Sequence, residues 1–215
     1  MPALSGIILS GGQSRRMGQD KAFLDLGGQR LIDRVAQTLG QVCDDLIVVA
    51  NDVERYRGSA WRVVPDAFPG AGSLGGLYTG LQAARYPYVV TVACDMPFLN
   101  VDLLRYLADA AQGWDASIPR APIEGMTGRG RRRDGSPTAK DVDLQPLHAV
   151  YHRRVARPIR ARIAAGDLRM IGFLSSVRVR YVSAEDVRRL DPQGVSFLNA
   201  NTPEEWQAVL ERLDG

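Results

Sequence analysis

The chain has 215 residues, 45% of them hydrophobic and 24% charged, which excludes a disordered protein and allows one sizeable core. Lysine and arginine total 27 against 24 acidic residues, so the net charge is +3, a mild excess that suits anionic ligands without requiring nucleic acid. We expect a single domain over residues 1–215.

Neither the cysteines nor the hydropathy indicates export or membrane insertion. Cys43 and Cys94 lie far apart and form neither a CxxC pair nor the framework of a small secreted domain. The N-terminal apolar run has no basic flank, and no stretch reaches the length of a membrane span. We therefore expect a cytoplasmic protein with reduced thiols.

Short apolar runs rich in Val and Ile alternate with segments of helical period. This alternation is typical of an α/β fold in which helices cover both faces of a mostly parallel sheet. The predicted strands are residues 6–10, 45–50, 61–65, 88–93, 116–119, 147–151 and 177–182.

Three helices have clear sequence signals. In two of them apolar residues recur every three or four positions and give the helix one buried face. These two sets are Leu31, Val35, Leu39 and Val42, and Leu103, Leu104, Leu107 and Ala111. The last helix is predicted to begin at Thr202, because Thr202, Pro203 and Glu205 fit an N-cap, a first-turn proline and a capping-box glutamate.

The segment SGGQSRRMGQDK follows the first predicted strand, where open α/β sheets bind ligands. The NH groups of Gly11 and Gly12 can approach an anion closely, and Arg15, Arg16 and Lys21 supply positive charge for a triphosphate. The segment fits neither GxxxxGK[ST] nor GxGxxG. The alternative is a turn that exposes basic residues.

The segment PDAFPGAGSLGGLYTGL, residues 65–81, places five glycines between a predicted strand and a predicted helix. Gly75 and Gly76 would let the backbone meet a flat base, and Asp66 would accept a hydrogen bond from a base or ribose. Glycine-rich loops are common, so this segment decides nothing by itself.

In VVTVACDMPFL, residues 89–99, a strand ends just before Asp95, which therefore faces the same crevice as the first loop. A carboxylate there suits Mg²⁺ bound to phosphate oxygens. The alternative role is a cap of the following helix, for which Asn100 is better placed.

Three other features carry weaker signals. Residues 125–141, rich in Arg, Gly, Ser and Pro, are predicted to form a mobile basic loop whose arginines are either solvated or grip phosphates. His148 and His152 are four residues apart, but they flank a predicted strand end, where this spacing does not place both on one face of a helix, and no HExxH motif is present. Cys94 is interpreted as an inert strand cysteine and not as a nucleophile.

Nearly the whole chain resembles the molybdenum cofactor guanylyltransferases, a family of nucleotidyltransferases with a Rossmann-like fold. The resemblance rests on LSGGQSRRMGQDK (9–21), VVAN (48–51), PD (65–66), GSLGG (72–76), CDMP (94–97), QPLHAVY (145–151) and NANTPEE (199–205). It implies transfer of GMP from GTP to the terminal phosphate of molybdenum-bearing molybdopterin, with release of pyrophosphate and with Mg²⁺ as cofactor. Such a reaction requires in-line geometry and cations more than covalent catalysis.

The resemblance also implies roles for individual residues. The nucleotide would be bound by the backbone of Leu9, Ser10, Gly11 and Gly12, by Arg15 and Lys21 at the triphosphate, and by Asn51, Asp66, Gly75 and Gly76 at base and ribose. Asp95 would bind Mg²⁺, and Asp95, Lys21 and Arg15 would be the catalytic residues. His148, Asn199 and Asn201 would lie on the molybdopterin side.

Ser10 and Ser73 stand where the family commonly has Ala and Pro. The first departure is expected to be harmless, whereas the second bears on base choice, because Pro would fix φ in the backbone that meets the base and Ser does not. The alternatives are a CTP-dependent molybdopterin cytidylyltransferase or a sugar-phosphate nucleotidyltransferase, and the paired Gly11 and Gly12 favour the GTP-using branch. A third hypothesis, a nucleic-acid-binding module using the RGRRR stretch, lacks a recognisable reading motif. Proteins that deliver molybdopterin or accept the product are further expected partners.

Overall fold

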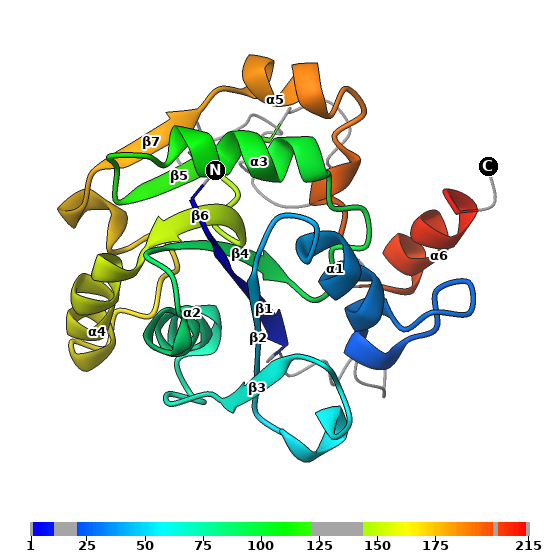
Figure 1. Cartoon of the computed structure of the whole chain (residues 1–215), viewed down its shortest axis with the longest axis horizontal. Coiled ribbons are helices and arrows are strands. Elements are labelled where there is room, and N and C mark those ends of the chain that lie inside the picture. The colour runs from blue at the N-terminus through cyan, green and yellow to red at the C-terminus, as the bar shows by residue number, and fades with distance from the viewer. Residues whose placement is uncertain (1, 11–20, 122–143, 200–201, 214–215) are drawn as a thin grey trace, which may run out of the picture.

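The computed structural model describes residues 2–10, 21–121, 144–199 and 202–213 (Figure 1). In these ranges, seven strands form one sheet: β1 (Ser5–Ser10), β2 (Asp45–Ala50), β3 (Arg62–Pro65), β4 (Tyr88–Ala93), β5 (Ala116–Pro119), β6 (His148–His152) and β7 (Val179–Val182). Each lies within two residues of its predicted bounds. The basic segment 125–141 lies outside the described residues.

The described part of the chain also contains six α-helices: α1 (Leu31–Leu39), α2 (Gly72–Ala83), α3 (Val101–Ala110), α4 (Ala156–Ala164), α5 (Ala184–Leu190) and α6 (Pro203–Glu211). Short 3₁₀ turns include η1 (Lys21–Phe23), η2 (Glu54–Tyr56), η3 (Arg153–Val155), η4 (Leu174–Ser176) and η5 (Val195–Phe197). Among the described residues, no helix is long and apolar enough to cross a membrane.

The strand order is β3-β2-β1-β4-β6-β5-β7, and β6 alone runs antiparallel to its neighbours β4 and β5. The predicted mostly parallel α/β sheet is therefore confirmed. The chain moves from β1 to β2 and β3 on one side and returns to place β4 on the other side of β1. At such a reversal, open α/β sheets bind ligands in the crevice beyond the carboxyl ends of the strands, here those of β1 and β4.

Helices cover both faces of the sheet, with α2 and α4 on one face and α1, α3 and α5 on the other (Figure 1). Side chains of one strand alternate between the two cores: Ile7 and Leu9 pack beneath α2, whereas Ile8 belongs to the core beneath α1 and α3. Burial on both faces explains why the strands read as continuous apolar runs.

Two predicted helix starts are confirmed by side-chain caps. The Asn100 Oδ1 accepts a hydrogen bond from the Leu103 NH at 2.9 Å, and the Thr202 Oγ1 accepts one from the Glu205 NH at 3.2 Å. These bonds satisfy first-turn NH groups that have no partner within the helix. One detail differs from the prediction, because α1 ends at Leu39 and leaves Val42 in the following turn.

The glycine-rich segment was predicted as a loop before a helix, which is wrong for most of its length. Helix α2 already begins at Gly72 and contains Gly75, Gly76 and Gly80. A Cβ atom at Gly80 would lie 2.5 Å from the Ile7 Cδ1, and one at Gly76 would lie 3.1 Å from a Leu9 Cδ. The glycines therefore let α2 pack directly against β1, which overrides their poor helix propensity.

Candidate active site

Sheet register brings the ends of four strands to one edge. Ser10 pairs with Ala50, Ala50 pairs with Pro65, and Leu9 pairs with Ala93. The residues that follow these strands, Asn51, Asp66 and Asp95, are therefore at the same edge as the start of the first loop. Leu9 and Ala93, 84 residues apart in the sequence, become neighbours there.

The last two residues of β1, Leu9 and Ser10, each contact another part of the chain. The Leu9 carbonyl oxygen accepts a hydrogen bond from the Cys94 NH at 3.1 Å, which continues the pairing of β1 with the chain beyond β4. The Ser10 Oγ lies 2.6 Å from the Tyr56 Oη, so the hydroxyl of Ser10 has a structural partner that an alanine would lose. Gly11, Gly12 and Arg15 lie outside the described residues.

Lys21 reappears at the far end of the first loop, where it begins η1. It is only 8% exposed, a low value for a lysine, whose charged head normally stays in water. The adjacent aromatic pair, Phe23 and Tyr56, has ring centroids 5.0 Å apart. Lys21 therefore belongs to η1, which packs through Phe23 on Tyr56, the residue whose hydroxyl contacts Ser10.

Asp66 follows β3 and has one carboxylate oxygen fixed. Its Oδ1 accepts hydrogen bonds from the Phe68 NH and the Thr79 hydroxyl, both at 2.9 Å. Its Oδ2 has no hydrogen-bond partner in the described chain and remains available to a donor. Sequence reasoning missed Thr79, because no motif links a helical threonine to a carboxylate thirteen residues earlier.

Asn51 follows β2 and is exposed, and its amide makes no hydrogen bond to any residue that the structure describes. Gly75 and Gly76 are buried within α2. A Cβ atom at Gly75 would lie 2.6 Å from the Phe68 carbonyl oxygen, so this glycine lets α2 pass close to the turn that carries Asp66. Ser73 is exposed in the first turn, where proline is also accommodated, so this departure from the family pattern does not require a different backbone.

Asp95 lies half-buried in the turn after β4. Met96 anchors this turn in the core, and the Arg34 Nε of α1 donates a hydrogen bond to the Pro97 carbonyl oxygen at 2.9 Å. Because Asn100 caps α3, the helix-cap alternative for Asp95 is wrong. The turn instead presents Asp95 beside the end of β1.

His148 is completely buried at the start of β6, beside Val92 of β4. Neither ring nitrogen has a hydrogen-bond partner among the residues that the structure describes, and the ring stands nearly edge-on to Phe197, with 5.0 Å between centroids. The Oδ1 of Asn199, two residues after Phe197, is also buried, and no described residue bonds to it. Both predicted residues thus belong to the region where η5 covers β6, while Asn201 lies outside the described residues.

Burial lowers the pKa of His148 from 6.5 to about 4. In the folded protein the imidazole is therefore neutral between these values, whereas the unfolded chain binds a proton below about pH 6.5. The free energy of unfolding should fall as the pH drops through this window, by roughly 2 kcal/mol between pH 7 and pH 5. Urea unfolding of the wild type and His148→Phe at both pH values measures this difference, and the variant should lose most of it. Equal pH dependence in the two proteins would contradict the assignment to His148.

His148 and His152 both lie on β6, four residues apart, which separates their Cα atoms by roughly 13 Å along a strand. They contact different aromatic rings, Phe197 and Tyr88 respectively. Such a distance is too long for the two side chains to share one zinc ion. Within the described ranges, no group of three His, Cys, Asp or Glu residues is arranged to hold a metal.

A crevice at the switch point of a parallel sheet, with a buried lysine at the end of the first loop and a carboxylate after β4, can hold a nucleotide and orient its phosphates. This fold and this arrangement define a nucleotidyltransferase. The model of the MobA-like NTP transferase domain matches residues 6–180, and the chain belongs to that family.

Relatives with closely similar sequences support this assignment. The probable molybdenum cofactor guanylyltransferase of Pelotomaculum thermopropionicum is 38% identical over 199 residues, which are 93% of this chain and 88% of that protein. The molybdenum cofactor guanylyltransferase of Desulfosudis oleivorans is 37% identical over 209 residues, covering 96% and 94% of the two chains.

The fold has a close counterpart among solved structures. Molybdopterin-guanine dinucleotide biosynthesis protein A from Archaeoglobus fulgidus aligns with a TM-score of 0.78 over 98% of both chains, at 24% identity. This likeness shows that the two chains share a fold.

Proposed function

We propose that this protein transfers GMP from GTP to the terminal phosphate of molybdenum-bearing molybdopterin, forming molybdopterin guanine dinucleotide and releasing pyrophosphate. The observation that carries the proposal is the convergence of Ser10, Asn51, Asp66 and Asp95 at one sheet edge, beside a first loop that ends at the buried Lys21. The names of the two relatives reported above agree with this substrate pair.

Different residues along the crevice would bind different parts of the two substrates. The exposed Asn51 amide and the free Oδ2 of Asp66 would bind base and ribose, because both offer hydrogen-bonding atoms without a partner in the described chain. Lys21, with Arg15, would bind the triphosphate and stabilise charge on the departing pyrophosphate. His148, Asn199 and Asn201 would lie on the molybdopterin side, opposite the nucleotide.

Mg²⁺ is the cofactor that we propose, and the donor chemistry fits it. Magnesium is usually held by one or two carboxylates together with substrate phosphates, so a cluster of protein ligands is unnecessary. Asp95 is the candidate carboxylate, because its turn follows β4 at the crevice. When bound, the ion would neutralise charge on the phosphate oxygens during transfer.

The second candidate is a CTP-dependent transfer to molybdopterin. It shares the crevice, the lysine and the carboxylate, and differs only in the base. The sequence relatives reported above carry the guanylyltransferase name, which favours GTP.

We also propose a cellular location, a domain organisation and partner proteins for this enzyme. Cys43 and Cys94, one buried and one half-buried, lie far apart in the sequence and form no CxxC pair, which supports a cytoplasmic location. The membership of all seven strands in one sheet supports a single domain over residues 1–215. Proteins that supply molybdopterin and accept the dinucleotide are the proposed partners.

The first test compares thermal unfolding with GTP, CTP, UTP and ATP, each with and without Mg²⁺. Selective binding to the folded state stabilises it by about 2.7 kcal/mol at a ligand concentration of 100 times Kd. We expect a stabilisation by GTP that Mg²⁺ strengthens, followed by pyrophosphate release when molybdopterin is added. A shift with CTP alone would favour the second candidate, and no shift with any nucleotide would contradict both.

A further inference from the structure

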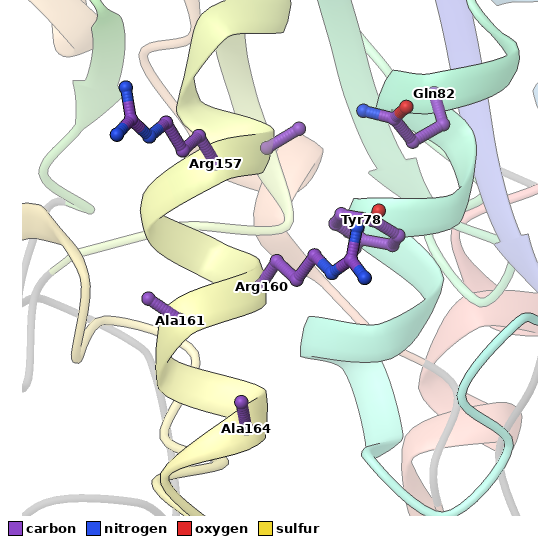
Figure 2. A pocket seen from close by; sticks show the side chains of 7 residues that line it. Tyr78, Gln82, Arg157, Arg160, Ala161 and Ala164 are labelled. Atoms are coloured by element: carbon purple, nitrogen blue, oxygen red, sulfur yellow. The ribbon is translucent and has the colours of Figure 1, made fainter.

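The outer surfaces of α2 and α4 form an open groove, with a volume of about 470 Å³ (Figure 2). Its lining residues are Tyr78 and Gln82 of α2 and Ala156, Arg157, Arg160, Ala161 and Ala164 of α4. None of them belongs to the candidate active site, because the groove lies on the helices that cover one face of the sheet. The crevice lies instead beyond the ends of the strands.

The charge of the groove is positive and uncompensated. Helix α2 contains no acidic or basic residue, and α4 contains three arginines and no acid. Arg162 pairs with Asp167 at 3.0 Å. The side chains of Arg157 and Arg160 make no ion pair or hydrogen bond within the described part of the chain. Two guanidinium groups are therefore free to bind carboxylates.

The shape of the groove suits a helix. Arg160 extends from α4 toward Tyr78 of α2, whereas Arg157 and Ala161 project from the other side of α4 (Figure 2). Ala161 and Ala164 are small and exposed, so they leave room for a close approach along α4. The Tyr78 ring is held edge-on against Phe68 at 5.3 Å, so this wall of the groove is fixed. From Arg157 to Ala164 the groove extends roughly 10 Å, about two turns of a second helix.

We propose that this groove binds an acidic helical segment of a partner protein. Carboxylates of that segment pair with Arg157 and Arg160, and its small or apolar residues pack on Ala161 and Ala164, as in other helix-in-groove complexes. Docking on this face leaves the crevice open to nucleotide. The proposal goes beyond the proposed reaction and does not depend on it.

The openness of the groove argues against two other occupants. Sites for small molecules bury most of the ligand, whereas five of the seven lining residues here are exposed. Surfaces for single-stranded nucleic acid combine a long basic track with stacking aromatic rings. This groove has two free arginines and one aromatic ring, which already packs on Phe68.

The test uses a fluorescent acidic peptide of about five helical turns, with Glu along one face and Ala and Leu along the other, and a control peptide with Gln in place of Glu. Fluorescence anisotropy at physiological salt measures binding to the full chain. Arg157→Glu/Arg160→Glu should weaken binding at least about tenfold. The matched control, Arg180→Glu/Arg188→Glu, makes the same change in net charge at two exposed arginines outside the groove and should bind like the wild type.

A second pair of variants tests the shape without changing charge. Ala161→Trp should fill the groove and weaken binding, whereas Ala208→Trp on the exposed side of α6 should not. The proposal would be overturned if both charge variants lost binding equally, or if the Gln peptide bound as tightly as the Glu peptide. It would also be overturned if GTP displaced the peptide, if a single-stranded oligonucleotide of equal charge bound more tightly, or if the acidic peptide did not bind at all.

Discussion

Asp95→Asn is expected to lower kcat for transfer of GMP by about 1000-fold, equivalent to roughly 4 kcal/mol of transition-state stabilisation. The substitution keeps the size of the side chain but removes the negative charge that we propose binds Mg²⁺ beside the phosphates. The turn around Asp95 should persist, because Met96 in the core and the bond from Arg34 to Pro97 hold it independently. Steady-state release of pyrophosphate over a range of Mg²⁺ concentrations measures the effect.

The matched control is Asp109→Asn, which removes an exposed carboxylate from α3 with no side-chain bond in the described chain. It should leave both the rate and the Mg²⁺ dependence unchanged. Thermal unfolding of both variants separates loss of chemistry from loss of fold. A near-normal rate for Asp95→Asn would remove this residue from the proposed metal site.

Lys21→Met is the second large effect, with an expected loss in kcat/KM for GTP of about 100-fold, roughly 3 kcal/mol. Methionine retains most of the buried aliphatic length of Lys21 but cannot neutralise a phosphate. The loss should appear in KM for GTP and in kcat together, because we propose that the ammonium binds the triphosphate and also stabilises the departing pyrophosphate. Initial rates at varied GTP, with molybdopterin saturating, separate the two parameters.

Lys21→Arg serves as the charge-preserving comparison. It should retain more activity than the methionine variant, although the larger guanidinium does not fit a site that leaves Lys21 only 8% exposed as well as an ammonium does. Equal activity in the wild type and Lys21→Met would contradict a role in binding the triphosphate. A similar loss of thermal stability in both variants would instead indicate a packing role.

Most of the fold follows from local patterns. The strands were predictable because burial on both faces selects continuous apolar runs, such as Ile7 to Leu9, which are easily distinguished from amphipathic helices. The starts of α3 and α6 were predictable because Asn100 and Thr202 act within three residues of their own position. These signals involve neighbours in sequence and need no tertiary contact.

The glycine-rich segment was harder, because its helical state depends on contacts with distant residues. Gly76 and Gly80 lie against Leu9 and Ile7 of β1, and such close packing outweighs low helix propensity. Gly75 likewise reflects the approach of the Phe68 carbonyl group. A reading of glycines as flexible loop residues cannot detect these contacts.

In the candidate site, too, some residues could be predicted from local sequence and others could not. The sequence predicted Lys21, Asn51, Asp66 and Asp95 as site residues, because each follows or flanks a recognisable strand or loop. It did not reveal that Thr79 fixes the Asp66 Oδ1 or that Tyr56 contacts the Ser10 hydroxyl. Those partners are thirteen and forty-six residues away, and polar side chains of this kind carry no periodic signal.

By itself, the sequence determined the class of fold, the order of the elements and the family, because apolar periodicity, caps and loop motifs are local properties of the chain. The tertiary structure decided which strand ends share an edge, how deeply Lys21 and His148 are buried, and that Arg157 and Arg160 border a groove between α2 and α4. The physical reason is that sheet register and helix packing bring together residues far apart in sequence, and burial and charge balance arise only from those contacts.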